Sequence, residues 1–320
     1  MSVRAFIFPG QGSQAVGMGR ELADAFTAAR EVFQEVDDTL RQKLSRLIFE
    51  GPLDELTLTE NAQPALMAMS MAVVRTMESE AGFRLREKVV VVAGHSLGEY
   101  SALAAAGSFS LGDAARLLKL RGQSMQKAVP AGEGAMAALL GVEMDDAVSI
   151  CGEAAAVPES EEREIIAPAN DNGGGQIVIS GHRSAVERAV ELAKARGVRR
   201  AMLLPVSAPF HCPLMAPAAD IMAEALEGAS LAPPVPPVVA NVSAAKATDP
   251  IEIRDLLVRQ VTAMVRWRES VQAMTALGVD TFIEAGAGKV LSGLVRRIVP
   301  DAATLSAGSP ADIEAVLKTF

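Results

Sequence analysis

A serine set between two glycines, directly after a run of valines, limits what this chain can fold into more than any other feature. Residues 89–100 read VVVVAGHSLGEY. Consecutive β-branched residues predict a buried strand, and the residues from Leu97 onward favour a helix. G-x-S-x-G between a strand and a helix fits a sharp turn that lifts the serine hydroxyl off a sheet. The stretch predicts Ser96 as a nucleophile; a plain strand-to-helix turn with a capping serine is the alternative.

Short apolar runs alternate with helical stretches over most of the 320 residues. Runs that are apolar on both sides are typical of parallel strands covered by helices, so we expect an α/β fold with a mainly parallel sheet. The expected strands are residues 3–8, 89–93, 235–240, 281–284 and 303–305. The expected helices are residues 17–47, in one or more pieces, then 61–81, 97–106, 111–127 and 266–277.

One section has a different rhythm and predicts a small inserted unit. Its expected order is strand 135–142, helix 144–155, strands 165–170 and 176–180, helix 183–196 and strand 200–206. The order β-α-β-β-α-β is that of a ferredoxin-like unit, and stretches rich in turn-forming residues flank it on both sides. We therefore predict a large α/β domain formed by residues 1–130 and 207–320, and a small ferredoxin-like subdomain over residues 131–206.

Composition and charge argue against several classes of function. Half of the residues are hydrophobic and the formal net charge is −9. With no long basic run, we expect neither a nucleic-acid partner nor a membrane partner. The two cysteines do not suggest a disulfide framework or a metal cluster. The first residues lack the apolar run of a signal peptide, and no segment approaches the roughly 20 apolar residues of a membrane span. We expect a cytoplasmic protein and a monomer.

A serine hydroxyl is a weak nucleophile without an adjacent base, and the chain has three histidines. His95 precedes the serine, and on a sharp turn its ring should point away from the hydroxyl, in a supporting role. His182 begins an expected helix and is interpreted as a surface cap. His211 lies in the loop SAPFHCPLM, and loops on rigid scaffolds often hold catalytic groups. We predict His211 as the base. Cys212 is a rival nucleophile, which we interpret as a small apolar filler.

The helix expected over residues 111–127 places a cation where an apolar residue belongs. Arg121 falls in the middle of the apolar face, whose other members are Ala114, Leu117, Leu118 and Met125. A buried guanidinium without an anionic partner costs several kcal/mol. Two partners are open: an acidic side chain of the protein, or a substrate carboxylate held by the planar fork of the guanidinium. The helix follows soon after the serine's own helix, so Arg121 could reach the pocket of Ser96.

A glycine-rich turn, FPGQGSQ, follows the first expected strand at residues 8–14. The G-x-G-x-x-A pattern at residues 10–15 does not fit a dinucleotide site, because that motif needs a second strand ending in an acid, and residues 17–47 look helical instead. We interpret the turn as one that presents backbone N–H groups, with Gln11 placed to complete an oxyanion site with the N–H of Leu97. GAGKV at residues 286–290 lacks phosphate-loop spacing and is interpreted as an ordinary helix start.

Together these motifs resemble one family, the malonyl-CoA:acyl carrier protein transacylases of type II fatty-acid synthesis. The resemblance covers essentially the whole chain. It rests on five motifs in order, which are FPGQGSQ at 8–14, GHSLGEY at 94–100, LKLRGQSMQ at 118–126, FHCPLM at 210–215 and RQ…VRW within 259–267. The resemblance implies a hydrolase-like core that carries a ferredoxin-like subdomain, in agreement with the pattern of elements.

The resemblance also implies how the reaction is divided among residues. Ser96 would be the acylated nucleophile, and His211 would be the general base and acid. Arg121 would bind the malonyl carboxylate. A carbonyl of Gln260 would orient His211 in place of a triad carboxylate, which fits the lack of a clear acidic third member among the motifs.

The remaining residues implied by the resemblance bind the acyl group. Gln11 and Leu97 would supply the oxyanion N–H groups. Met125 and Phe210 would be substrate-binding residues, and Phe210 is similar to the bulky residue that malonyl-selective relatives use to crowd out α-branched units.

Malonyl-CoA and acyl carrier protein are the partners that the resemblance implies, and no metal or redox cofactor is expected. Acyl carrier proteins are acidic, so docking onto an acidic enzyme should need a local basic patch. The candidates are Lys194, Arg196, Arg199 and Arg200, or Lys289, Arg296 and Arg297. Solvated surface charge is the alternative interpretation of either cluster.

Three other functions stay open at this point. A serine thioesterase or esterase can share GHSLG, although it has no reason for an inward arginine. A loading acyltransferase of polyketide synthesis would use malonyl or methylmalonyl units. A non-catalytic scaffold on the same fold is disfavoured by the presence of Ser96, His211 and Arg121 together.

Overall fold

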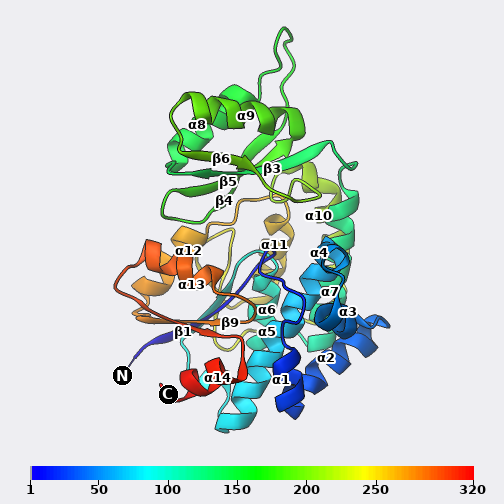
Figure 1. The fold of residues 1–320 in the computed structure, drawn as a ribbon, viewed down its shortest axis with the longest axis vertical. Coiled ribbons are helices and arrows are strands. Elements are labelled where there is room, and N and C mark those ends of the chain that lie inside the picture. Colours follow the sequence, from blue (N-terminus) through cyan, green and yellow to red (C-terminus); the bar gives the residue numbers. More distant parts are fainter. Residues whose placement is uncertain (1) are drawn as a thin grey trace.

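A six-stranded sheet forms the centre of the larger part of the computed structural model, which describes residues 2–320 (Figure 1). Its strands are β1 (Arg4–Phe8), β2 (Val91–Gly94), β7 (Val238–Val239), β8 (Lys246–Ala247), β9 (Thr281–Ala285) and β10 (Ala303–Ala307). They lie in the order β10-β9-β1-β2-β7-β8, and all neighbours are parallel except β7 and β8. The five expected strands are confirmed, and the two-residue β8 is an addition.

Both faces of this sheet are buried, which explains why its strands are apolar on both sides. In β1, Ala5 and Ile7 contribute to one hydrophobic cluster, while Phe6 and Phe8 contribute to another. The first cluster is completed by α12 (Trp267–Ala276) and α13 (Val290–Ile298). The second, larger cluster draws on ten helices, among them α5 (Thr59–Ala81), α6 (Gly98–Ala105), α7 (Leu111–Lys127), α10 (Ala216–Glu227), α11 (Pro250–Gln260) and α14 (Pro310–Leu317).

The helical stretch expected over residues 17–47 is interrupted twice. It consists of α1 (Arg20–Ala25), α2 (Thr27–Leu40) and α3 (Leu44–Glu50), and α4 (Leu53–Thr57) follows. Phe26, between α1 and α2, is extended, and Arg41 after α2 has a φ of 49°. Neither conformation continues a right-handed helix, so the breaks lie where the backbone leaves the helical region.

Besides the short α4, three helices were not anticipated from the sequence, namely α10, α11 and α14. Each has a proline in its first turn, at positions 217, 250 and 310 respectively. Proline is favoured in the first helical turn because its missing N–H would have no intrahelical partner there. Proline is also a signal for turns, and this is why these helix starts were missed. Two short 3-10 segments, η1 (Leu85–Glu87) and η2 (Pro213–Met215), complete the helical elements.

The predicted inserted unit forms a separate four-stranded sheet (Figure 1). Its elements are β3 (Gly134–Leu140), α8 (Met144–Ala154), β4 (Ile166–Asp171), β5 (Gln176–His182), α9 (Arg183–Ala195) and β6 (Arg200–Leu203). The order β4-β5-β3-β6 is antiparallel throughout, as in a ferredoxin-like unit. The helices α8 and α9 share a hydrophobic cluster with the sheet on the side turned away from the large sheet. The exact residues at which the two domains divide stay a prediction.

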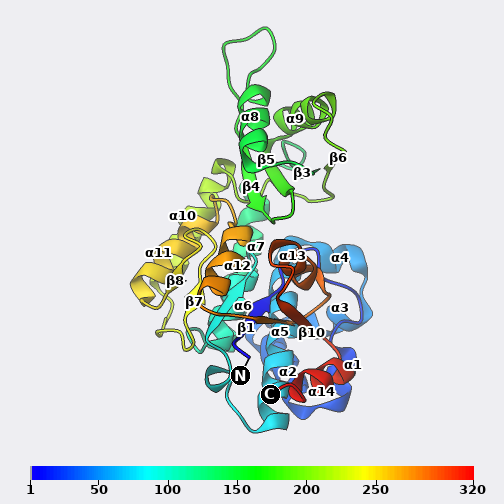
Figure 2. The same cartoon turned by 90° about the vertical axis from the view of Figure 1, so that its left-hand side faces the viewer.

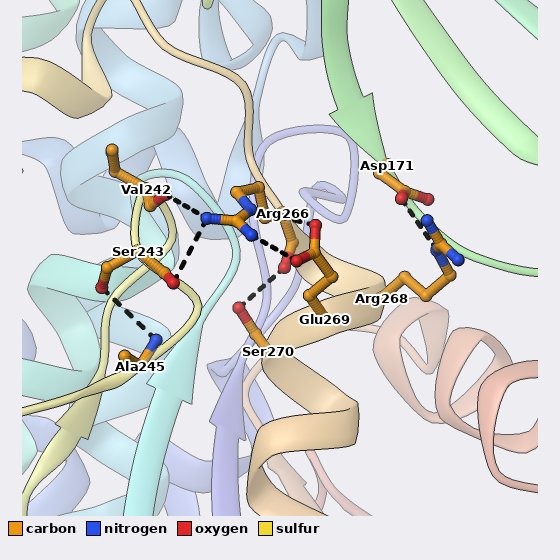
Figure 3. Close-up of polar contacts among 8 residues, drawn as sticks. All are labelled: Asp171, Val242, Ser243, Ala245, Arg266, Arg268, Glu269 and Ser270. Carbon is orange, nitrogen blue, oxygen red and sulfur yellow. Dashed lines mark hydrogen bonds and ion pairs between the residues drawn. The ribbon is translucent and has the colours of Figure 1, made fainter. Parts of the chain in front are cut away.

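The end of β4 joins the small sheet to the large part of the molecule (Figure 2). Val265 N–H donates to the carbonyl of Ala169 at 2.9 Å, and Asp171 N–H donates to the carbonyl of Val265 at 2.9 Å. Arg268 Nε donates to Asp171 Oδ2 at 2.8 Å, and beside it Arg266 pairs with Glu269 (Figure 3). We call these contacts the β4 seam. They fix the loop after β4 above the carboxyl ends of the large sheet's strands.

The longest helix, α5, has 23 residues and is buried along most of its length. It packs against α7, and Gly122 of α7 lies directly on the start of α5. A Cβ atom added at Gly122 would lie 2.6 Å from the carbonyl oxygen of Thr59 and 2.6 Å from the Cα of Glu60. The two backbones therefore approach closely enough to require glycine. Within residues 2–320, no helix is both long and apolar enough to cross a membrane.

We predict that Gly122→Ala lowers the free energy of unfolding by about 2–4 kcal/mol, because backbone must move to admit the methyl group. Gly152→Ala is the matched control: Gly152 is an exposed helical glycine of α8 with no atom within 4 Å of its added Cβ. That change should raise the free energy of unfolding by about 0.5–1 kcal/mol. Urea unfolding measures both, and equal effects of the two substitutions would contradict this account of the α5–α7 contact.

Candidate active site

Ser96 lies on the turn between β2 and α6, in a backbone conformation that few residues adopt. Its φ is 53°, in the left-handed region. A Cβ at Gly94 would lie 1.9 Å from the carbonyl carbon of Gly98, and a Cβ at Gly98 would lie 2.2 Å from the carbonyl oxygen of Phe8. Both glycines of G-x-S-x-G are therefore required by close backbone approach. The turn places Ser96 at the carboxyl edge of the parallel sheet, as the motif predicts.

His211 contacts the serine hydroxyl, with its Nε2 2.7 Å from Ser96 Oγ. Its Nδ1 lies 2.9 Å from the backbone carbonyl oxygen of Gln260 and 3.2 Å from that of Ala263. Carbonyl oxygens only accept hydrogen bonds, so the neutral ring carries its proton on Nδ1. Nε2 is then left to accept the hydroxyl proton of Ser96. The resemblance placed the Gln260 carbonyl here; the second carbonyl, from Ala263, was not anticipated.

The surroundings of His211 hold its imidazole in the neutral form. Burial lowers the pKa of His211 to about 3, and the charge of Arg121 acts in the same direction. The carbonyls of Gln260 and Ala263 oppose this lowering through their hydrogen bonds to the ring. The ring is therefore neutral at physiological pH, which is the form in which a histidine accepts a proton.

Arg121 points into the protein from α7, as its place on the apolar face predicts, and its residue is only 1% exposed. Its Nη1 donates to Gln63 Oε1 at 2.8 Å. Its Nη2 donates to Gln260 Oε1 at 2.9 Å and to Ser96 Oγ at 3.2 Å. Within residues 2–320, Arg121 forms no ion pair with a carboxylate, and its Nε has no hydrogen-bond partner. The cation thus lies beside the hydroxyl with neutral partners only.

The nearest compensating charge lies behind the amide of Gln260. Gln260 Nε2 donates to Glu99 Oε2 at 2.7 Å and to the carbonyl oxygen of Ser96 at 3.0 Å. Glu99 is 1% exposed, and burial raises the pKa of its carboxyl to about 7 while hydrogen bonds from Asn241 and Gln260 oppose this. The Gln260 amide therefore points its oxygen at a cation and its nitrogen at an acid. This arrangement fixes the orientation of the amide.

Two backbone N–H groups are available for an oxyanion. Among residues 2–320, neither Gln11 N–H nor Leu97 N–H has a hydrogen-bond acceptor. Both residues line the cavity that holds Ser96 and His211. The N–H of Ser96 itself is occupied, because it donates to Asn241 Oδ1 at 2.7 Å. The two donors are therefore free to hold an oxyanion, and that role stays a prediction.

The cavity above Ser96 has a volume of about 470 Å³ and lies between the two sheets. The expected substrate-binding residues Arg121, Met125 and Phe210 line it. Its small-sheet wall comprises Met136, Asn170, Asn172, Gln176 and Val178. This size is ordinary for a small-molecule site, and both domains contribute to its walls.

The other two histidines and the cysteines have contacts that argue against a catalytic role. His95 Nε2 lies 2.9 Å from Asn172 Oδ1, a contact that links the turn to the small sheet, and the ring is 5.6 Å from that of Trp267. His182 is the N-cap residue of α9, as expected, but its side chain makes no capping hydrogen bond, and its Nδ1 accepts from Ile165 N–H at 2.9 Å. Cys212 is buried, and burial raises the pKa of its thiol.

Within residues 2–320, no cluster of three or more His, Cys, Asp or Glu side chains could hold a metal ion.

The sequence analysis missed Asn241, Gln63 and Asn172, which complete the site. Asn241 had a usable signal, because it directly follows an expected strand of the same sheet and so reaches the same carboxyl edge. Gln63 lies in a helix that is buried along most of its length, and a buried glutamine requires a polar partner. Asn172 belongs to the turn between β4 and β5, which reads DNGGG at residues 171–175. The position of this turn over the site depends on how the two sheets are placed.

The chain is similar to known proteins over almost its whole length. A family model described as the acyl transferase domain matches residues 5–308. The chain is 47% identical over 320 residues to the malonyl CoA-acyl carrier protein transacylase of Bacillus subtilis (strain 168), covering 100% of this chain and 98% of the relative. A solved acyl-carrier-protein-S-malonyltransferase from Bartonella henselae is 56% identical, with 99% of each chain covered and a TM-score of 0.95. A solved malonyl-transacylase in complex with its type II PKS acyl-carrier protein is 42% identical, with 100% of each chain covered and a TM-score of 0.94.

We predict that His211 contributes to acid lability of the fold. Its pKa is lower in the folded chain than the ordinary value near 6.5, so below that pH the unfolded chain binds a proton that the folded chain does not. Stability from this group is thus lost as pH falls below about 6.5, by at most about 1.4 kcal/mol per pH unit. Between pH 7 and 5 the free energy of unfolding of His211→Gln should fall less steeply than that of the wild type. Urea unfolding measures both free energies, and an equal pH dependence in the two proteins would contradict the neutral, buried base.

Proposed function

This chain belongs to the acyl transferase family, and on that basis we propose that it transfers a malonyl group from malonyl-CoA to the phosphopantetheine thiol of an acyl carrier protein. Relatives named malonyl CoA-acyl carrier protein transacylase match it over almost their whole length. The observation that carries the proposal is Arg121, a buried cation 3.2 Å from the nucleophile and without an acidic partner among residues 2–320. A malonyl group supplies the missing carboxylate.

The first half of the reaction forms a malonyl-serine ester. Ser96 Oγ attacks the thioester carbonyl carbon of malonyl-CoA while His211 Nε2 takes the hydroxyl proton. The tetrahedral oxyanion is held by the N–H groups of Gln11 and Leu97, and each such donor contributes about 3–4 kcal/mol in comparable enzymes. The carbon–sulfur bond then breaks, and coenzyme A leaves as a thiol with the proton from His211. The Nδ1 contacts with the two carbonyls keep the ring oriented during both proton transfers.

The second half of the reaction transfers the malonyl group from Ser96 to the phosphopantetheine thiol. His211 takes the proton of the phosphopantetheine thiol, and the sulfur attacks the ester carbon of malonyl-Ser96. The same two N–H groups hold the oxyanion, and Ser96 leaves with the proton from His211. No metal or redox cofactor is required in this scheme, because the reaction exchanges an acyl group between two thiols at constant oxidation state.

A thioesterase is less compatible with the site than a transferase. Hydrolysis of neutral acyl groups would leave the Arg121 guanidinium buried without an ion-pair partner throughout the cycle, which is energetically costly. A substrate that ends in a carboxylate removes this cost on binding and positions its thioester over Ser96.

Free thiols at Cys151 and Cys212 are consistent with the cytoplasm as the compartment that we propose.

For acyl carrier protein, we propose docking on Lys289, Arg296 and Arg297, which we call the α13 cluster. All three side chains are exposed, and none forms an ion pair among residues 2–320. The same helix lines the cavity through Val290, Leu291 and Leu294. In the other candidate cluster, Lys194 pairs with Glu191 and Arg196 with Glu153, while Arg199 and Arg200 are exposed and form no ion pair among residues 2–320. No residue of that cluster lines the cavity. The α13 cluster thus combines uncompensated positive charge with a position at the cavity.

Incubation with malonyl-CoA should add one malonyl group to the wild type at Ser96, and Ser96→Ala should stay unmodified, as measured by intact mass and peptide mapping.

Arg121→Met keeps most of the side-chain volume and removes the charge. We expect it to lower kcat/KM for malonyl-CoA about 100-fold or more, since a charged bidentate contact is lost, and to raise acylation by acetyl-CoA.

Arg116→Met is the matched control, because Arg116 lies on the exposed face of the same helix and pairs only with Asp113. It should leave both substrates unchanged. Unaltered malonyl use by Arg121→Met would refute the role of Arg121, and release of free malonate as the main product would favour a thioesterase.

Reversing charge in the α13 cluster, by Lys289→Glu with Arg297→Glu, should raise KM for acyl carrier protein about tenfold and change KM for malonyl-CoA by less than about threefold. Lys194→Glu with Arg196→Glu reverses the same number of charges elsewhere and should have no such effect. Steady-state kinetics at low ionic strength makes the comparison, and equal effects of the two pairs would reject the α13 cluster as the docking surface.

A further inference from the structure

The pairing of β2 with β7 sets up an unusual contact at the nucleophile turn. The register places Val92 opposite Val238 and Ala93 opposite Val239, and Val92 N–H donates to the carbonyl of Pro237 at 3.0 Å. In a parallel ladder a residue bonds to the two residues that flank its partner. If this ladder continued past the end of β7, the N–H of Asn241 would donate to the carbonyl of Gly94. The carbonyl of Asn241 would then accept from the N–H of Ser96.

The side chain of Asn241 makes both of these bonds in place of its own backbone. Asn241 Nδ2 donates to the carbonyl oxygen of Gly94 at 2.7 Å, and Ser96 N–H donates to Asn241 Oδ1 at 2.7 Å. The backbone of Asn241 is used elsewhere: its N–H donates to Glu99 Oε2 at 3.1 Å, and its carbonyl accepts from Arg266 N–H at 3.1 Å. The amide therefore extends the sheet's ladder by one step into the turn.

This extension bears directly on the conformation of Ser96. A non-glycine residue in the left-handed region is strained and persists only where its surroundings enforce it. The two bonds lie on either side of His95, at the carbonyl two residues before the serine and at the N–H of the serine itself. Asn241 is fully buried at 0% exposure, so water does not compete for these bonds.

We propose that Asn241 is a positioning residue for the nucleophile, holding Ser96 Oγ at its reactive place by extending the β2–β7 ladder through its side-chain amide. The proposal rests on the proposed function, in which Ser96 is acylated. By occupying the N–H of Ser96, the amide also leaves the N–H groups of Gln11 and Leu97 as the oxyanion donors. Asn241 itself does not contact the reacting atoms.

Only asparagine satisfies both ends of this contact. Aspartate has nearly the same shape and keeps an acceptor for Ser96 N–H, but it lacks the N–H group that donates to Gly94. It would also place a second carboxylate near Glu99. Alanine leaves a buried N–H and a buried carbonyl without partners, each of which is costly. Asn241→Asp therefore tests the donor half of the contact with almost no change in volume.

Malonyl-CoA binding should not depend on Asn241, and this separates positioning from general structural support. The partners of Arg121 are Gln63, Gln260 and Ser96 Oγ, none of which is Asn241. The contact between Gln260 Nε2 and Asn241 Oδ1 is long, at 3.4 Å, and Gln260 keeps shorter bonds to Glu99 and Ser96. A positioning role predicts slower acylation at unchanged substrate affinity, whereas loss of structure would weaken both.

The experiment measures acylation and binding separately. Rapid mixing with malonyl-CoA and acid quench, followed by intact mass, gives the rate at which Ser96 is acylated. Calorimetry in the Ser96→Ala background gives the dissociation constant of malonyl-CoA without turnover. For Asn241→Ala and Asn241→Asp we expect acylation at least about tenfold slower than in the wild type, with dissociation constants within about threefold of the Ser96→Ala parent.

Asn61→Ala is the matched control. Asn61 is also a buried asparagine with several side-chain bonds, to Glu55, Gln42 and Lys119, but none of them involves Ser96 or His211. It should lose stability without slowing acylation. If Asn241→Ala does not fold, Asn241→Asp decides the question alone. An acylation rate within twofold of the wild type in a folded Asn241 variant, or a parallel loss of affinity, would overturn the proposal. A wild type that is not acylated at Ser96 would instead overturn the proposed function.

Discussion

The site depends on one cation, the Arg121 guanidinium, held inside the protein without an ion-pair partner among the described residues. Its hydrogen bonds join four segments, because it lies on α7 and contacts Gln63 on α5, Gln260 at the end of α11 and Ser96 on the turn after β2. Gln260 then connects this cation to the buried Glu99 and, through its backbone carbonyl, to His211. The charge is tolerated because polar groups around it are fixed by the fold before any substrate arrives.

Backbone strain marks the two residues that exchange the proton. Ser96 and His211 both have positive φ values, of 53° and 60°. Each is held by contacts from other segments: the Asn241 amide at the serine, and the carbonyls of Gln260 and Ala263 at the histidine ring. The strain is thus maintained by bonds that also set the orientation of the reacting atoms, which is a recurrent feature of functional sites.

Features that are local in sequence could be predicted, and features that depend on tertiary placement could not. The strand–serine–helix turn and the misplaced cation at Arg121 are both visible within about one helix length. Two partners of Arg121, Gln63 and Gln260, are 58 and 139 residues away in the chain, and the role of Asn241 follows from the strand order, which was not predicted. The β-α-β-β-α-β unit was recognised because its elements are consecutive, whereas helices that begin with proline were hidden by a residue that also signals turns.

The β4 seam has a consequence for how such a protein changes over evolutionary time. The small sheet has its own hydrophobic cluster with α8 and α9, and it meets the nucleophile's side of the cavity through a few contacts near Asp171 and Asn172. Substitutions that tilt one sheet against the other would widen or narrow the space for the acyl chain while Ser96, His211 and Arg121 keep their mutual geometry. Acyl-chain tolerance can therefore diverge between lineages through packing at a distance, with the chemical machinery left intact.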